Sequence, residues 1–265
     1  MKRFFLFIGS IILVSFIFVF YYYDDRWSSL WALETPMELY PIKHKSDDTL
    51  RVVMIGDSWV GMRNDTINLD FQRSLLSLIC KPIKVKTRGR GGEKSRGIYK
   101  YLFEYGEYGT RGLMEESPDY CVIFAGINDA ASNRGTKQFL HHYRLILQFL
   151  VDNNIQPVVV EIPDVNIWKV KKEKPIKDLI GDYVKSIMTN CGLYRYNEYR
   201  EDLNAMLNSE KFINKVVFVP MIEWNGGSRL KTDLFLDDQI HLNSLGYAKM
   251  DSCIAVHIAN HYCSR

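Results

Sequence analysis

Several residue patterns that identify common classes of enzyme are missing from this chain of 265 residues. No two cysteines stand at zinc-site spacing and no His-Glu-x-x-His motif is present, so no metal site of a familiar type is predicted. The chain also lacks Gly-x-Ser-x-Gly, P-loop and Gly-x-Gly-x-x-Gly motifs. Their absence argues against an α/β-hydrolase nucleophile elbow, a P-loop nucleotide site and a dinucleotide fingerprint. We expect neither a metal nor a cofactor.

Charge and cysteine content are also low. The net charge of +3 is too small to indicate nucleic-acid binding. Five cysteines do not form a dense disulfide framework, and their odd number excludes complete pairing, although one bond, for example between Cys253 and Cys263, stays open. His257 and His261 have a spacing that suits a metal, but the sequence offers no third ligand, and a helix surface is the expected interpretation.

The longest hydrophobic run covers residues 4–23 and contains no charged side chain. As a helix it would be about 30 Å long, which matches the hydrocarbon core of a bilayer. Lys2 and Arg3 precede the run and three tyrosines end it, as in an interfacial aromatic belt. This charge pattern predicts a transmembrane helix with its N-terminus in the cytoplasm and the remaining chain outside.

A cleaved signal peptide is the competing interpretation of this run. Such peptides have a shorter apolar region and small residues at the cleavage site, whereas this run ends in aromatics followed by Asp24. We therefore favour an uncleaved signal anchor over residues 1–23. Residues 24–49, with Pro36 and Pro41, are predicted to form a linker, and residues 50–265 a single catalytic domain.

Apolar runs and helix-like periodicities alternate along this domain, which indicates α/β architecture with a parallel sheet. We predict a three-layer α/β/α fold with a five-stranded, mainly parallel sheet. Strands are expected near 51–56, 83–87, 120–125, 156–161 and 215–219. Helices are expected near 67–79, 94–105, 136–152, 174–189 and 243–260.

Three short motifs contain the residue types needed for nucleophilic catalysis. Gly-Asp-Ser ends the first predicted strand at Ser58, and Asp238 and His241 stand three residues apart before the last predicted helix. A serine hydroxyl needs a neighbouring base, and a histidine that acts as this base needs a carboxylate to fix its tautomer. Asn128, directly after the third predicted strand, would place an amide donor at the same edge of the sheet. A further donor is expected from the backbone of residues 89–93, a glycine-rich loop.

In their order and type, these blocks resemble those of the SGNH hydrolases, the GDSL esterase/lipase superfamily. The resemblance covers residues 51–262 and implies that Ser58 is the nucleophile, His241 the base and Asp238 its orienting partner. It also implies an oxyanion hole formed by the backbone N–H groups of Ser58 and Gly92 and by the side chain of Asn128. Gly92 is preferred to its neighbouring glycine because an acidic residue follows it, as is usual in the second block of the family.

The chain departs from the family name at Trp59, where the name has leucine. Trp59 would form a bulkier wall beside the nucleophile. Trp59 and Trp224 would either stack on a sugar ring or belong to the core. A basic group lies around the second block and is either a solvated loop or a rim that holds an anionic or hydroxyl-rich substrate. It consists of Lys86, Arg88, Arg90, Lys94 and Arg96.

The resemblance implies ester hydrolysis through an acyl-serine intermediate. Because members with one short exported domain often act on acylated carbohydrates, an O-acetyl esterase of a surface glycan is the preferred expectation. A lysophospholipase or thioesterase, an acyltransferase that uses a sugar acceptor, and a non-catalytic glycan-binding protein on the same fold remain alternatives. The expected partners are an ester substrate and, through the N-terminal helix, a membrane.

Overall fold

The computed structural model divides the chain into two compact units, Met1–Glu34 and Thr35–Arg265. Its described residues are 6–17, 33–45, 47–132, 135–166, 175–189, 195–225 and 231–265.

The first unit contains a helix over residues 6–17 with exposed side chains. Among the described residues, no helix combines the length and the apolar character needed to cross a bilayer. The hydrophobic run over 4–23 is longer than this helix, and residues 4–5 and 18–23 of the predicted span lie outside the described residues.

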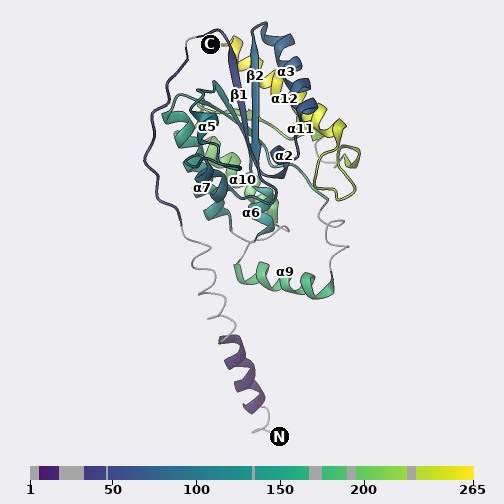
Figure 1. Cartoon of the computed structure of the whole chain (residues 1–265). Coiled ribbons are helices and arrows are strands. Elements are labelled where there is room, and N and C mark those ends of the chain that lie inside the picture. The colour runs from purple at the N-terminus through teal and green to yellow at the C-terminus, as the bar shows by residue number, and fades with distance from the viewer. Residues whose placement is uncertain are drawn as a thin grey trace. The chain divides into compact units, whose positions relative to one another are not determined.

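The second unit is built on a sheet of five parallel strands with the order β2-β1-β3-β4-β5 (Figure 1). The order of the strands along the sheet reverses between β1 and β3, and the carboxyl ends of strands at such a switch point are the usual ligand-binding position of open α/β sheets. The predicted three-layer fold with a five-stranded parallel sheet is confirmed. The strands are β1 (Leu50–Gly56), β2 (Ile83–Gly89), β3 (Tyr120–Phe124), β4 (Gln156–Val160) and β5 (Val217–Val219).

Helices cover both faces of the sheet (Figure 1). Alternate residues of β1 face opposite layers, so Val52 and Met54 pack in one hydrophobic cluster and Val53 and Ile55 in the other. The first cluster includes α3 (Asp65–Ile79), α11 (Ile222–Asn225) and α12 (Ser244–Cys263). The second includes α4 (Ser95–Tyr101), α5 (Arg111–Met114), α7 (Gly135–Asp152) and α10 (Tyr196–Leu207). Helix α10 has no counterpart among the predicted helices.

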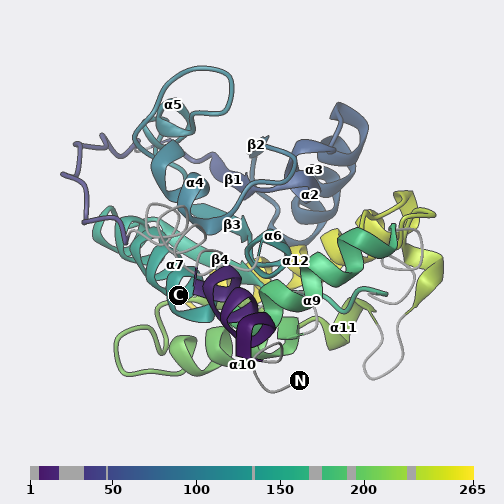
Figure 2. The ribbon, with the colours of Figure 1, turned by 90° about the horizontal axis from the view of Figure 1, so that it is seen from below.

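Two short helices begin at the carboxyl ends of the central strands. Helix α2 (Ser58–Gly61) follows β1, and α6 (Ile127–Ala131) follows β3. Figure 2 views the domain from below, the side on which both helices lie. The predicted helix near 174–189 is present as α9 (Ile176–Thr189). The Ser58 and Asn128 motifs therefore meet at one edge of the sheet, because parallel strands end on the same side.

Residues 35–45 differ from the linker that the sequence predicted over 24–49, because they pack on the domain. Tyr40 is buried, and its hydroxyl donates a hydrogen bond of 2.7 Å to the carbonyl of Leu102. The guanidinium of Arg111 lies 4.4 Å from the centre of the Tyr40 ring. Burial of a large aromatic ring with a polar tip is favourable when both parts find partners. Leu102, directly after α4, and Arg111 of α5 are the partners here.

Candidate active site

Ser58 is the first residue of α2 and follows β1 after a single intervening residue. That residue, Asp57, caps α2, since its carboxylate accepts a hydrogen bond of 3.0 Å from the backbone N–H of Trp59. At the end of β2, position 89 must be a glycine, because a Cβ atom on Gly89 would lie 2.5 Å from the backbone nitrogen of Gly61 in α2. The end of β2 thus packs directly against α2 and fixes the position of Ser58.

The structure brings Ser58, His241 and Asp238 together in a chain of hydrogen bonds. The Nε2 atom of His241 lies 3.0 Å from the Ser58 hydroxyl oxygen, and its Nδ1 atom lies 2.6 Å from an oxygen of Asp238. Ser58 is mostly buried, whereas the side chains of His241 and Asp238 are 28% and 45% exposed. The serine therefore sits at the base of an accessible site, with the imidazole between it and the carboxylate.

The loop that carries Asp238 and His241 is closed by its own backbone. Phe235 and Leu242 form an antiparallel bridge, and the N–H of Leu236 donates to the carbonyl of His241 at 2.7 Å. Gln239, between the bridge partners, has a positive φ of 59°, which makes the tight turn. The loop is thereby a rigid support for the two side chains.

Asp238 is held as a carboxylate by this same turn. One of its oxygens accepts hydrogen bonds of 2.9 Å from the backbone N–H groups of Ile240 and His241. Partial burial raises the pKa of Asp238, but the hydrogen bonds from the His241 ring and from these backbone groups outweigh burial and lower it below the ordinary value. An ionised Asp238 accepts the Nδ1 proton of His241, which leaves Nε2 free to accept a proton from Ser58.

Asn128 lies on α6 and points toward the residue that precedes the serine. Its side-chain nitrogen donates a hydrogen bond of 3.1 Å to the carboxylate of Asp57. The sequence analysis missed the contact between Asp57 and Asn128, which are 71 residues apart. The signal that could have indicated this contact is the position of Asp57 inside the Gly-Asp-Ser motif. One of the two N–H bonds of the Asn128 amide is used by Asp57, and the other stays available for a ligand.

Asp57 is fully buried, and burial raises its pKa to about 7 even though hydrogen bonds from Trp59 and Asn128 oppose the shift. The unfolded chain, in which the pKa is near 3.8, therefore binds fewer protons than the folded chain between these two values. The free energy of unfolding should then decrease as pH rises through this interval and stay level above it. Asp57→Asn should remove about 2 kcal/mol of that decrease between pH 5 and 7.

Urea unfolding of the wild type and of Asp57→Asn at both pH values measures this difference. Equal pH dependence in the two proteins would show that Asp57 does not titrate in this range.

Gly92 lies on the loop between β2 and α4, and its φ of +72° favours glycine. Two contacts hold this loop beside the serine and asparagine segments. The N–H of Arg90 donates to the carbonyl of Gly56 at 3.1 Å, and Asp129 accepts hydrogen bonds from the N–H and hydroxyl of Ser95, the first residue of α4. Asp129 thus supports the site, while the role of Gly92 as an oxyanion donor stays a prediction.

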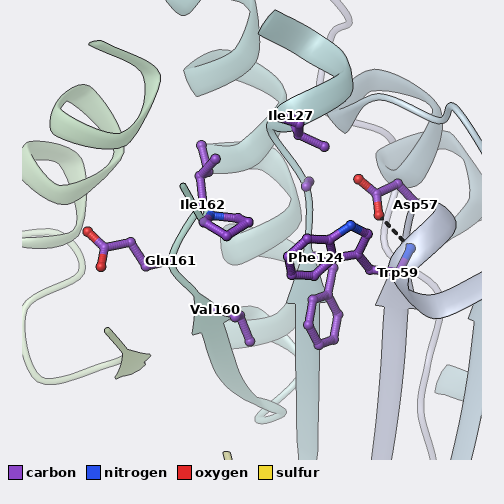
Figure 3. Close-up of a pocket in the computed structure, with 9 residues that line it drawn as sticks. Asp57, Trp59, Phe124, Ile127, Val160, Glu161 and Ile162 are labelled. Atoms are coloured by element: carbon purple, nitrogen blue, oxygen red, sulfur yellow. Dashed lines mark hydrogen bonds between the residues drawn. The ribbon is translucent and has the colours of Figure 1, made fainter. Parts of the chain in front are cut away.

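Of the two interpretations of Trp59, the structure corrects the substrate-binding one, in which it stacks on a sugar ring, and supports a place in the core. Trp59 is only 3% exposed and packs edge-on against Trp224, with 5.9 Å between the ring centres. It also lines a cavity of about 20 Å³ beside Asp57, which Figure 3 shows with Phe124 and Ile127 around the indole. A space of this size holds about one water molecule and excludes a sugar ring.

The basic group of residues 86–96, which begins within β2, is largely engaged with the protein itself. Lys86 pairs with Glu116, Arg88 donates to the carbonyls of Gly106 and Gly109, and Arg90 donates to the hydroxyl of Tyr101. Arg90 also lies 4.9 Å from the centre of the Tyr108 ring. These contacts favour a structural role over the substrate rim that was the alternative. Within the described residues, the potential metal ligands that cluster together are Glu223, Cys253 and His257, on α11 and α12 and outside this site.

Asn128→Ala should lower kcat by about 10²–10³ with little change in KM, because an oxyanion donor acts mainly in the transition state. Steady-state kinetics on a short-chain nitrophenyl ester measures both constants. Asn68→Ala provides a matched control, since Asn68 is an amide that bonds Arg63 and Thr87 on the α3 side of the domain. An unchanged kcat in Asn128→Ala would leave Asn128 as a support for Asp57 alone.

The comparisons with known proteins agree with this geometry. The sequence profile of the GDSL-like Lipase/Acylhydrolase family matches residues 54–249, which include Ser58, Asn128, Asp238 and His241. No curated protein matches the chain.

Solved structures share the fold at low sequence identity. A lipase/acylhydrolase from Enterococcus faecalis is 15% identical with a TM-score of 0.57, covering 80% of this chain and 96% of its own. A GDSL-like lipase from Bacteroides thetaiotaomicron is 16% identical with a TM-score of 0.55, covering 89% and 97%. A psychrotrophic esterase from Pseudoalteromonas is 15% identical with a TM-score of 0.52, covering 82% and 98%. With the profile matching well over half of its residues, this chain belongs to the GDSL-like lipase/acylhydrolase family and is an ester-cleaving hydrolase of the SGNH type.

Proposed function

We propose that the chain hydrolyses a carboxylic ester through an acyl intermediate on Ser58. The observation that carries this proposal is the hydrogen-bond chain from Ser58 through His241 to Asp238, with distances of 3.0 and 2.6 Å. The Ser58 hydroxyl oxygen attacks the ester carbonyl while its proton passes to Nε2 of His241. Asp238 stabilises the imidazolium that forms.

The negative charge on the carbonyl oxygen is then held by hydrogen-bond donors. In this proposal they are the backbone N–H groups of Ser58 and Gly92 and the free N–H of the Asn128 amide. His241 returns its proton to the departing alkoxide, which leaves as the alcohol. A water molecule next gives a proton to His241 and attacks the acyl group, so that a carboxylic acid is released and Ser58 is regenerated.

We infer that the acyl group is short and that the substrate is an O-acetylated glycan. The short acyl group rests on the resemblance to the SGNH hydrolases, as the glycan does. The glycan is inferred in two steps. The hydrophobic N-terminal run supports export of the domain, and exported SGNH domains often act on carbohydrates.

Initial rates on acetylated xylose oligomers, lysolipids and acyl thioesters test this choice. We expect turnover of the acetylated sugars, with a steep fall in kcat/KM as the acyl chain of a nitrophenyl ester grows from two to eight carbons. Faster hydrolysis of lysolipid or long-chain thioester would overturn the glycan substrate. Transfer of acetyl to an added sugar acceptor in preference to water would identify a transferase.

We also propose that the enzyme is anchored by residues 4–23 and works on the outer side of the membrane. The charge-free run, the preceding Lys2 and Arg3 and the tyrosines at its end support this orientation. A periplasmic reporter fused after Arg265 should be active, and alkaline carbonate should leave the protein in the membrane fraction. A soluble form that begins near Asp24 would show instead that the segment is a cleaved signal peptide.

A further inference from the structure

Three side chains of metal-ligating type meet where α11 packs against α12. Cys253 and His257 are separated by one helical turn of α12, and Glu223 faces them from α11. One oxygen of Glu223 lies 3.2 Å from the Cys253 sulfur and 2.7 Å from Nε2 of His257. All three ligand atoms lie within 4.8 Å of one another.

We propose that Glu223, Cys253 and His257 bind a divalent transition-metal ion of the zinc class. In a tetrahedral zinc site, ligand atoms at about 2.0–2.3 Å from the metal are about 3.4–3.6 Å from each other. The observed separations of 3.2 and 2.7 Å are slightly shorter because hydrogen bonds now join the groups. Small side-chain rotations would therefore open the cluster to the spacing that a metal requires.

The chemistry of the three ligands selects among metals. A thiolate and an imidazole favour zinc and its neighbours over magnesium or calcium, which prefer oxygen ligands. On binding, the sulfur loses the proton that it now donates to Glu223, and the metal takes the place of that proton. The side chains of His257 and Glu223 are 24% and 46% exposed, so a water molecule can reach the fourth position.

The spacing in the sequence had drawn attention to a different pair of potential metal ligands, His257 and His261. The fold separates their roles, because Nδ1 of His261 lies 2.9 Å from the hydroxyl of Tyr120 and His261 takes no part in the cluster. Cys253 stands one turn earlier on α12 and supplies the second ligand, while Glu223 becomes adjacent only through the packing of α11.

A metal at this position would link α11 to α12 close to the helix that begins with Ser58. Trp224, the neighbour of Glu223, is buried against Trp59, and the hydroxyl of Tyr247 on α12 donates to the Trp59 carbonyl at 2.9 Å. Both helices thus contact the residue that follows Ser58. The expected role is structural, since none of the three ligands belongs to the hydrogen-bond chain of Ser58.

Metal binding is testable on the purified full-length chain in mild detergent, stripped of metal and kept reduced. Zinc titrated against a chromophoric chelator should bind at one equivalent, and the melting temperature should rise by about 5–10 °C at a free zinc concentration 100 times Kd. Cobalt should give tetrahedral d–d bands and a sulfur-to-metal charge-transfer band. Loss of an outer partner already costs about 10–100-fold in metal affinity, so Cys253→Ser and His257→Gln should each cost at least about 100-fold.

Cys263→Ser is the matched control, because Cys263 is an exposed cysteine in the last turn of the same helix. It should keep the affinity and the charge-transfer band. Binding that is unchanged in Cys253→Ser, a band that disappears in Cys263→Ser instead, or the absence of any zinc-dependent rise in melting temperature would overturn the proposal. These readouts do not involve ester hydrolysis and are therefore independent of the proposed reaction.

Discussion

Ser58→Ala is expected to lower kcat by on the order of 10⁵–10⁶ and to abolish labelling by a fluorophosphonate probe. The reason is that the Ser58 hydroxyl is the nucleophile in the proposed reaction and lies 3.0 Å from the base that activates it. The fold should persist, because the hydroxyl pairs with His241 and a hydrogen bond of this kind contributes about 0.5–1.5 kcal/mol to stability.

Probe labelling followed by mass spectrometry, together with kcat on a short-chain ester, measures both effects. Ser77→Ala serves as the matched control, since Ser77 is an exposed serine of α3 whose hydroxyl bonds a carbonyl of its own helix. It should label and turn over like the wild type. If Ser58→Ala retained probe labelling and ester turnover, the nucleophile would have to be another residue.

His241→Ala should reduce kcat to within about tenfold of the Ser58→Ala value, and the double variant should be no worse than either single one. This non-additivity is expected because a serine without its base and a base without its serine both lack the activated nucleophile. Asp238→Asn should cost less, about 10⁴ in kcat, because the imidazole remains but takes the wrong tautomer. The wild-type kcat/KM should also decrease on acidification, since a protonated imidazole cannot accept the serine proton.

A double-mutant cycle of Ser58→Ala and His241→Ala, with kcat measured for each protein, checks this coupling. His44→Ala is a suitable histidine control, because His44 pairs with the hydroxyl of Ser117 and takes no part in the hydrogen-bond chain of Ser58. Additive losses in the double variant would mean that the two residues act separately. Full activity in His241→Ala would remove it from the mechanism.

The sequence by itself was sufficient to determine the sheet and the order of the site motifs. Strands β1, β3 and β4 contain short apolar runs such as Val52–Ile55, and burial on both faces makes such runs recognisable without knowledge of their neighbours. The motif residues follow directly from the strands, and parallel strands end on one side. For this reason Ser58 and Asn128 could be placed at the same edge before any coordinates were known.

Local patterns were less informative where burial depends on a distant partner. Helix α10 presents Tyr199, Leu203 and Met206 at helical spacing, but several charged residues lie between them and the pattern was overlooked. Tyr40 was assigned to a linker because two prolines flank it, although its ring packs near α4 and α5. Proline limits regular secondary structure and does not prevent an extended segment from packing on a domain.

Tertiary structure alone decided which side chains touch one another. Trp59 had two open interpretations in the sequence, and packing against Trp224 from 165 positions away makes it a core residue. The contact of Asp57 with Asn128 and that of Glu223 with Cys253 have the same origin, because each pair comes from elements that meet only after the sheet and its helix layers assemble. Apolar periodicity is encoded locally, whereas the proximity of polar groups is set by the packing of whole elements. For this reason the sequence predicted the chemistry of the motifs but not the side chains that surround them.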